Sequence, residues 1–323
     1  MDRRKFLKSV AITGAVAVGG KTLLKESSGM DILSQTFVNG ASAAPATTAA
    51  NFDLVAVLGG EPEAMFRKAI AEMGGMGKFI KKGDKVVVKP NIGWDKSPEL
   101  AANTNPKLVT EVIKQCFKAG AKEVTVFDHT CDDWRKCYTN SGIEAAAKAA
   151  GAKVVPAHQE SYYRQVALPK GKSLKSTKIH EAIVNCDKWI NIPVLKNHGG
   201  AQMTISMKNY MGIVWDRGFF HANDLQQCIA DVCTYDKRPV LNIVDAYRLM
   251  KTSGPRGKSA SDVVLTKGLF ISQDIVAVDT AAVNFFSQVR EMPLAKVSHL
   301  SKAQDLNVGT MDLNKLKVRR VKI

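Results

Sequence analysis

The sequence of 323 residues lacks the short motifs that identify several common classes of enzyme and electron carrier. It contains no Cys-x-x-Cys-x-x-Cys run, so the chain carries no ferredoxin-type iron-sulfur ligand set of its own. No Gly-x-Gly-x-x-Gly or phosphate-cradling loop follows a predicted strand, which argues against a dinucleotide or P-loop site. No His-x-x-x-His pair and no internal repeat is present either. Any function therefore depends on residues that the fold brings together.

The N-terminus has the pattern of a bacterial export signal. Residues 2–8 read Asp-Arg-Arg-Lys-Phe-Leu-Lys and precede an uncharged, weakly apolar stretch at 9–20. A twin arginine in this position is typical of proteins that are exported already folded, and the apolar stretch is far shorter than the ~20 residues of a spanning helix. Ala-Ser-Ala at 41–43 fits a small-x-small cleavage site. We expect a twin-arginine signal peptide at 1–43 and a periplasmic mature protein; an uncleaved signal that tethers the chain to the membrane is the alternative.

The remainder of the chain divides into a short linker and a much larger unit. Residues 44–51 are mostly small and polar and offer nothing to bury in a core, so we expect a linker there. Residues 52–323 are enough for one large α/β domain, with two intimate lobes as the alternative.

The chain is strongly basic, with a formal net charge of +16 at pH 7. Removal of residues 1–43 takes away six basic and three acidic side chains and leaves about +13. The lysines are spread along the chain, and export separates the protein from nucleic acid, so we expect no nucleic-acid partner. An anionic small molecule, acidic lipid headgroups or an acidic protein partner fits this charge better.

Six cysteines are present, and an exported protein can pair them as disulfides. Cys228 and Cys233 are five positions apart on a predicted helix, where they point in different directions. Cys131 and Cys137 lie on either side of Trp134 in a predicted loop, and they are the first candidates for a bridge.

Helical and extended patterns alternate from residue 52 onward. Predicted strands cover 52–58, 85–89, 123–127, 154–155, 189–192, 240–244 and 268–272, and an edge strand lies within 315–323. Predicted helices cover 62–73, 106–119, 143–150, 179–185, 221–234 and 275–289. Helices between successive strands indicate a mostly parallel sheet with helices on both faces, so we predict an α/β fold.

Polar residues follow directly after five of the predicted strands. They are Lys89–Asn91, Asp128–Thr130, Lys196–His198, Asp245 and Gln273–Asp274. Because the carboxyl ends of parallel strands open onto one edge of a sheet, where ligands bind, we expect these residues to line one rim. The segment 215–221 is expected to cover this rim as a loop.

The densest of these segments is 196–209, in which Gly199 and Gly200 let the backbone turn sharply. Ammonium and amide groups at the rim suit a carboxylate or phosphate ligand. We predict that this ligand is bound by Lys89, Asn91, Asn197, Thr204, Lys208 and Asn209. If the site is catalytic, Lys196 and His198 transfer protons, because crowded lysines lower one another's pKa and histidine titrates near neutrality. Solvated lysines at strand ends are the alternative.

A divalent metal site is the second possibility. Nitrogen and oxygen ligands are offered by Asp128, His129, His198, Asp245 and Asp274. The nearby lysines oppose a cation, however, and aspartates in such positions often cap the next turn or helix. We therefore predict no metal ligand and no cofactor, and a metal-dependent hydrolase is kept as an alternative.

Several short segments together resemble the domain of unknown function 362 family. The likeness rests on 86–91, 192–198, 204–212, 244–246 and 274–279, and it extends over roughly 52–289. The resemblance implies an α/β fold and no established reaction. Some members are joined to iron-sulfur cluster domains, which implies a connection with redox pathways, whereas this chain lacks cluster ligands.

Two hypotheses from different classes follow. The first is an exported protein that binds a small carboxylate or phosphate at the rim, with proton transfer by a lysine and His198 if it is an enzyme. The second is an accessory partner of periplasmic or membrane redox complexes, such as iron-sulfur or cytochrome complexes, that docks through its basic surface. The membrane is expected to be contacted only through an uncleaved signal.

Overall fold

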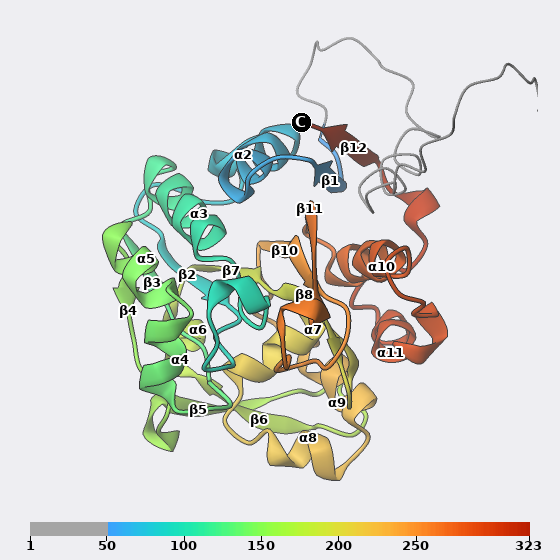
Figure 1. The fold of residues 1–323 in the computed structure, drawn as a ribbon. Helices are drawn as coiled ribbons and strands as arrows, with labels where there is room; N and C mark the ends of the chain where they lie inside the picture. Colours follow the sequence, from blue (N-terminus) through green and yellow to red (C-terminus); the bar gives the residue numbers. More distant parts are fainter. Residues whose placement is uncertain (1–50) are drawn as a thin grey trace, which may run out of the picture.

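The structure is a computed structural model that describes residues 51–323. The predicted signal peptide and residues 44–50 of the predicted linker lie outside the described residues. A ten-stranded sheet has the order β12-β1-β11-β10-β7-β2-β3-β4, and β8 and β9 continue it beside β10 (Figure 1). Strands β5 and β6 form a separate two-stranded sheet.

The secondary structure follows the predicted alternation closely. The strands are β1 Leu54–Leu58, β2 Lys85–Pro90, β3 Glu123–Val126, β4 Lys153–Val154, β5 Tyr163–Ala167, β6 Ser176–His180, β7 Lys188–Ile192, β8 Val194–His198, β9 Gln202–Thr204, β10 Leu241–Met250, β11 Val263–Ser272 and β12 Val318–Lys322. The α-helices are α2 Pro62–Glu72, α3 Pro106–Lys118, α4 Trp134–Asn140, α5 Ile143–Ala149, α6 Glu181–Asn185, α7 Ser206–Asn209, α8 Gly218–Ala222, α9 Leu225–Val232, α10 Ile275–Phe286 and α11 His299–Asp305.

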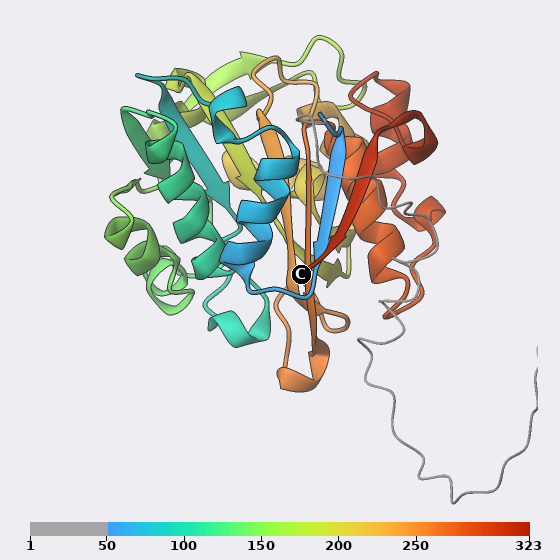
Figure 2. The same cartoon turned by 90° about the horizontal axis from the view of Figure 1, so that it is seen from above.

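The large sheet is mostly parallel, as predicted. Strands β2, β3, β4 and β7 run parallel to one another, and β10 runs parallel to β7. Strand β11 is antiparallel to both of its neighbours, β1 and β10. Among the described residues, the last strand, β12, pairs only with β1 at the edge of the sheet, which confirms the predicted edge strand. Figure 2 shows the two strands side by side.

Helices cover both faces of this sheet, and each face has its own hydrophobic core. Alternation along a strand divides the side chains between the cores, so Val55 and Val57 lie in one while Leu54 and Ala56 lie in the other. Helices α2, α3 and α5 contribute to the first core, and α9, α10 and α11 contribute to the second. The sheet therefore lies between two helical layers, and the predicted α/β class is confirmed (Figures 1 and 2).

Pro193 interrupts the extended chain without ending it, contrary to the expectation that a proline at this position ends the strand pairing. Strand β7 stops at Ile192, and β8 starts at Val194 and again lies parallel to β10. Strand β8 then turns back through 199–201 and pairs antiparallel with β9. The segment 196–198 therefore lies on a strand of a hairpin and not in a loop after one.

Three predicted boundaries are wrong for local reasons. The predicted helix 179–185 begins only at Glu181, because the preceding residues pair with β5, and His180 accepts a hydrogen bond from Ala182 N at the helix start. The predicted helix 221–234 is divided into α8 and α9, because Asp224 caps α9 through Gln227 N. Strand β10 continues past Val244 to Met250 through its pairing with β11.

Within residues 51–323, none of the helices has the length and apolar character required to cross a membrane.

Candidate functional site

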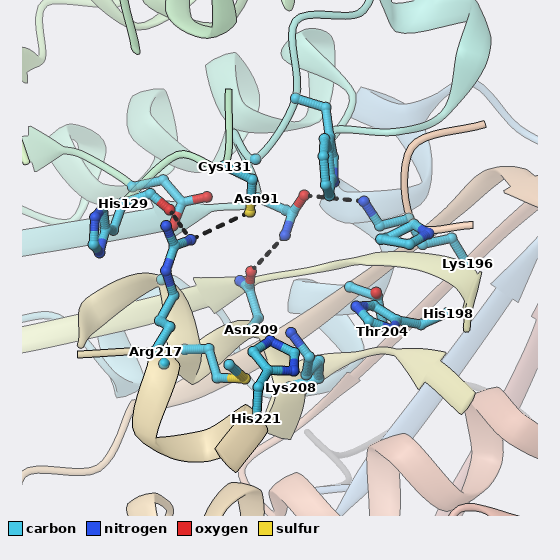
Figure 3. A pocket seen from close by; sticks show the side chains of 17 residues that line it. Asn91, His129, Cys131, Lys196, His198, Thr204, Lys208, Asn209, Arg217 and His221 are labelled. Carbon is cyan, nitrogen blue, oxygen red and sulfur yellow. Dashed lines mark hydrogen bonds between the residues drawn. The ribbon is translucent and has the colours of Figure 1, made fainter. Parts of the chain in front are cut away.

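A cavity of about 380 Å³ opens at the carboxyl ends of β2 and β3 (Figure 3). Its wall is completed by the β8–β9 hairpin, by α7 and by the segment around α8. Six of the eight predicted site residues line it, namely Asn91, Lys196, His198, Thr204, Lys208 and Asn209. Asn91 is more than a hundred positions away in the chain from the other five, and the parallel strands and the hairpin bring it beside them.

Lys89 lies beneath this cavity and does not line it. Its ammonium group is fully buried, 2.8 Å from Asp128 Oδ1, and it donates a hydrogen bond of 2.8 Å to Asn209 Oδ1. Burial lowers the pKa of Lys89, and the Asp128 carboxylate opposes that shift. The other oxygen of Asp128 accepts a hydrogen bond from Ile92 N. Lys89 therefore joins the ends of β2 and β3 to α7 under the floor of the site.

Asparagine side chains continue this buried network across the sheet. Asn209 donates to Asn191 Oδ1 at 2.8 Å, and Asn191 donates to Asn242 Oδ1 at 3.1 Å. On the cavity side, Asn91 Nδ2 donates to Asn209 Oδ1 at 3.1 Å, a contact that Figure 3 shows. Because each amide is held by the next, Asn91 and Asn209 present fixed polar groups to the cavity.

Asn197 points away from the cavity, toward the turn at the tip of the β10–β11 hairpin. Its Oδ1 accepts a hydrogen bond from Gly254 N, and Gly254 O accepts one from Gly199 N. This side chain lies on the opposite face of β8 from its two neighbours, because successive residues of a strand alternate. The placement gives Asn197 a structural contact with a turn whose Pro255 lines the cavity.

Lys196 is fully buried at the cavity wall, on β8. Its Nζ donates to Ala102 O and lies 3.4 Å from Asn91 Oδ1. Burial lowers the pKa of Lys196 to about 7, and the positive charges of Lys208 and Lys89 act in the same direction. A lysine of this kind exchanges its proton near neutral pH.

Lys208 projects into the cavity from α7. Two backbone N–H groups at the start of this helix, those of Ser206 and Met207, donate to the buried carboxylate of Asp279 at 2.8 Å each. Burial lowers the pKa of Lys208 to about 8, with a further contribution from Arg217. Within the described part of the chain, Lys208 has no hydrogen-bond or ion-pair partner, in contrast to Lys89 and Lys196.

His198 is held as a neutral hydrogen-bond donor. Its Nδ1 accepts hydrogen bonds of 3.1 Å from Gly200 N and Ala201 N, so the ring proton of the neutral form is on Nε2. Burial, together with the positive charges of Lys208 and Lys196, lowers the pKa of His198 to about 2. At neutral pH His198 therefore offers the Nε2–H of its neutral ring to the cavity, and the catalytic role predicted for it stays a prediction.

Several other side chains that line the cavity were not among the predicted ligand-binding residues, and they include Arg217, His129, Cys131 and His221. Arg217 precedes α8 and donates to His129 O and Thr130 O, at 2.9 and 2.7 Å. His129 donates a hydrogen bond from Nδ1 to Val214 O, so the Nε2 atom of its neutral ring carries no proton. Burial lowers the pKa of His129 to about 4. Cys131 also lines the cavity wall. His129 was named as a rim residue, whereas Arg217 was placed only within a segment expected to cover the rim.

Cys131 and Cys137 are both free thiols in this structure, so the candidate disulfide between them is not formed. Cys137 is buried within α4 with its Sγ 3.7 Å from Gly93 O, whereas Cys131 is exposed at the cavity.

Asp274 and Asp245 do not reach the cavity, contrary to prediction. Strand β11 is antiparallel, so its carboxyl end lies at the opposite edge of the sheet, where Asp274 caps α10 through Val276 N and Ala277 N. Asp245 lies inside β10 and accepts hydrogen bonds from Asn105 N and Tyr247 N. Among residues 51–323, no group of three or more His, Cys, Asp or Glu side chains is arranged to hold a metal ion.

The fold and this cavity define a mostly parallel α/β protein with a cationic site at the carboxyl edge of its sheet. The chain belongs to the family described as Domain of unknown function (DUF362), whose pattern matches residues 86–284. A relative is the thylakoid-associated protein sll1697 of Synechocystis sp. (strain PCC 6803), 26% identical over 224 residues, which cover 67% of each chain.

The solved structures that resemble this chain include the lactate racemase apoprotein from Thermoanaerobacterium thermosaccharolyticum. The TM-score is 0.42 and the identity 11%, over 71% of this chain and 57% of the other. The chain thus spans little more than half the length of that protein.

Proposed function

We propose that the cavity binds a small anion that carries a carboxylate or a phosphate. The observation that supports this most strongly is the imbalance of charge in its wall. Lys196, Lys208 and Arg217 line the cavity, and within residues 51–323 Asp128 is the only acidic side chain of its lining. Asp128 is already paired with Lys89, so it does not neutralise the other three cations. An anion supplies the missing charge.

The polar groups around the cavity fit the oxygen atoms of such a ligand. Lys208 offers an ammonium group that has no partner among residues 51–323, and His198 offers its Nε2–H. Asn91 and Asn209 are fixed by each other at the floor. Charge-assisted hydrogen bonds of this kind are shorter and stronger than neutral ones, so a compact anion gains most from this arrangement.

If the protein is an enzyme, Lys196 is its proton acceptor in this proposal. Burial brings its pKa to about 7, so a substantial fraction is the neutral amine at physiological pH. A bound anion that approaches Lys196 raises this pKa again and favours proton uptake. Lys208, with a pKa of about 8, then acts chiefly as the positive charge that holds the ligand.

Thermal unfolding across an anion series tests this proposal. Phosphate, sulfate, acetate and chloride are compared at equal ionic strength, so that charge screening is the same. The general stabilisation of folded proteins by phosphate and sulfate is shared by wild type and variants, so the comparison between them isolates the site. The proposal expects phosphate or a carboxylate to raise the melting temperature of wild type above its value in chloride, and expects a smaller rise in Lys208→Gln. Lys172→Gln, which removes an exposed lysine outside the cavity lining, is the matched control. Equal shifts in wild type and Lys208→Gln for every anion contradict the proposal.

The second candidate is an accessory role beside a membrane or redox complex. It is favoured by the net charge of +16 and by the name of the Synechocystis relative, which describes that protein as thylakoid-associated. Pull-down from bacterial extract at low and high salt tests it, because docking through a basic surface weakens as ionic strength rises. Export through the predicted twin-arginine signal is tested by fractionation of cells that express wild type or an Arg3→Lys, Arg4→Lys variant.

The metal-dependent hydrolase is tested by elemental analysis of the purified protein. A stoichiometric divalent metal supports that alternative, and a metal content well below stoichiometric contradicts it.

A further inference from the structure

Cys131 differs from the other cysteines of the described chain in its environment. It is exposed at the cavity wall, directly after the loop that leaves β3, whereas the other five are buried. Burial raises the pKa of each of these five thiols, which makes them poor nucleophiles, and they are Cys116, Cys137, Cys186, Cys228 and Cys233. The only cysteine within reach of a cavity ligand is therefore Cys131, among residues 51–323.

Backbone groups hold the loop that carries Cys131. The backbone N–H of Cys131 donates to Gly93 O at 2.8 Å. Arg217 fixes the same loop through two backbone carbonyl groups, and its Nη1 also lies 3.2 Å from Cys131 Sγ. The thiol thus lies in a firmly positioned loop beside a guanidinium group and faces the cavity (Figure 3).

A second observation indicates that a ligand occupies the same cavity. Thr204 lines the cavity on the β9 side, is only 3% exposed, and its hydroxyl oxygen has no hydrogen-bond partner among the described residues. A buried hydroxyl without a partner is costly. Lys208, which also lacks a partner, lies in the same wall. A ligand that forms hydrogen bonds with Thr204 and Lys208 would lie in the part of the cavity that the Cys131 thiol faces.

We propose that Cys131 is a nucleophile of this site and that its partner is a small anion with an electrophilic carbonyl carbon. The inference rests on the proposed anion site and extends it to a substrate class. In the covalent step, the sulfur forms a bond to the carbonyl carbon while the C=O π bond opens. The proton that leaves the thiol ends on the former carbonyl oxygen, so atoms and electrons balance without an oxidant or reductant. The product is a reversible hemithioacetal.

Alkylation with two reagents that differ in charge tests the nucleophile. Iodoacetate and iodoacetamide both form an S–C bond and release iodide, but only iodoacetate is an anion. We expect iodoacetate to modify Cys131 faster than iodoacetamide, and we expect Lys208→Gln to reduce that rate ratio by about tenfold, because the local cations concentrate an anionic reagent. Lys172→Gln should leave the ratio unchanged, and Cys131→Ser should abolish the labelling.

Protection by glyoxylate tests the carbonyl class. Glyoxylate carries a carboxylate and an aldehyde, whereas acetate carries only the carboxylate. We expect glyoxylate to slow iodoacetamide labelling of Cys131 well beyond the effect of acetate at equal concentration. Protection should disappear after dialysis, because the adduct is reversible.

The outcomes separate this inference from the anion site on which it rests. If phosphate stabilises wild type but iodoacetamide modifies Cys131 faster than iodoacetate, and glyoxylate protects no better than acetate, the nucleophile is refuted and the anion site stands. If no anion stabilises wild type more than Lys208→Gln, the anion site is refuted, and the substrate class proposed for Cys131 falls with it.

Discussion

Lys89 Nζ lies 2.8 Å from Asp128 Oδ1 in the interior of the protein, where the two side chains are 0% and 2% exposed. Lys89 is the residue before the last in strand β2, and Asp128 follows the neighbouring strand β3, so the ion pair joins two strand ends under the cavity. Removal of one partner leaves an uncompensated buried charge. We therefore expect the pair to contribute to the stability of the fold and to the shape of the cavity floor.

We expect Lys89→Met to destabilise the protein by about 3–5 kcal/mol, because it leaves the Asp128 carboxylate buried and unpaired. Urea unfolding at pH 7 measures the change. The double variant Lys89→Met, Asp128→Leu should recover a large part of the loss, since neither charge remains. A double variant that is less stable than Lys89→Met alone would show that the pair is not the source of the effect.

Gly212 is required by the close approach of the chain to the same ion pair. A Cβ atom at this position would lie 1.9 Å from Asp128 Oδ1 and 2.4 Å from Lys89 Nζ. We expect Gly212→Ala to destabilise the protein by about 1–3 kcal/mol or more and to weaken anion binding, because the pair must move. Gly77→Ala is the matched control, since nothing lies within 4 Å of its added Cβ. The melting temperature should fall in Gly212→Ala and stay close to that of wild type in Gly77→Ala; equal melting temperatures in the two variants would contradict the prediction.

The lowered pKa of Lys196 predicts a pH dependence of stability. Between about pH 7 and its ordinary pKa of 10.5, Lys196 binds less of a proton in the folded state than in the unfolded state. The free energy of unfolding should therefore rise with pH in this window, by up to about 1.4 kcal/mol per pH unit from this group. Denaturant midpoints of wild type and Lys196→Met between pH 7 and 9 measure it. The slope should be smaller in Lys196→Met and unchanged in Lys172→Gln; equal slopes in all three proteins contradict the lowered pKa.

Anion affinity should have the opposite pH dependence. Lys196 and Lys208 lose protons between pH 7 and 9, because their pKa values are about 7 and about 8. We therefore expect phosphate to bind more weakly as the pH rises, after correction for its own ionisation. Titration with sulfate, which does not ionise in this range, removes that correction. At pH 7.5 it should also show proton uptake in two buffers of different ionisation enthalpy. Binding without proton uptake would show that the anion does not change the protonation of Lys196 or Lys208, and would contradict this prediction.

The fold was predictable because alternation of apolar strands and amphipathic helices is a local property of the sequence. Strand direction is not local, which explains the error at Asp274. The segments 240–244 and 268–272 look alike, yet the second runs antiparallel because β10 and β11 are joined as a hairpin. The polar segment 251–262 between the two strands gave no sign that they form one long hairpin. The capping box that Ser259 and Asp262 form in this segment was not predicted.

About half of the cavity lining was predictable, from polar residues at strand ends and from the segment 196–209, and the remainder was not. Lys196 and His198 share one face of β8, whereas Asn197 lies on the other, and period-two alternation would have separated them had the strand been recognised past Pro193. Arg217 contacts the site only through the placement of α8 against the β3 loop. A signal for it was present in the cluster at 215–221, but no pattern in the sequence places that cluster in space.

Calorimetric titration of phosphate into wild type and Lys208→Gln at pH 7 and fixed ionic strength tests the central claim most directly. The account predicts saturable, stoichiometric binding to wild type and an affinity about 10-fold to 100-fold weaker in Lys208→Gln, since a charge-assisted hydrogen bond contributes about 1.5–3 kcal/mol. Lys208→Gln should be at least as stable as wild type without phosphate, because the ammonium group has no partner in the described chain and burial lowers its pKa. No saturable heat in wild type, or equal affinity in the two proteins, would contradict the account.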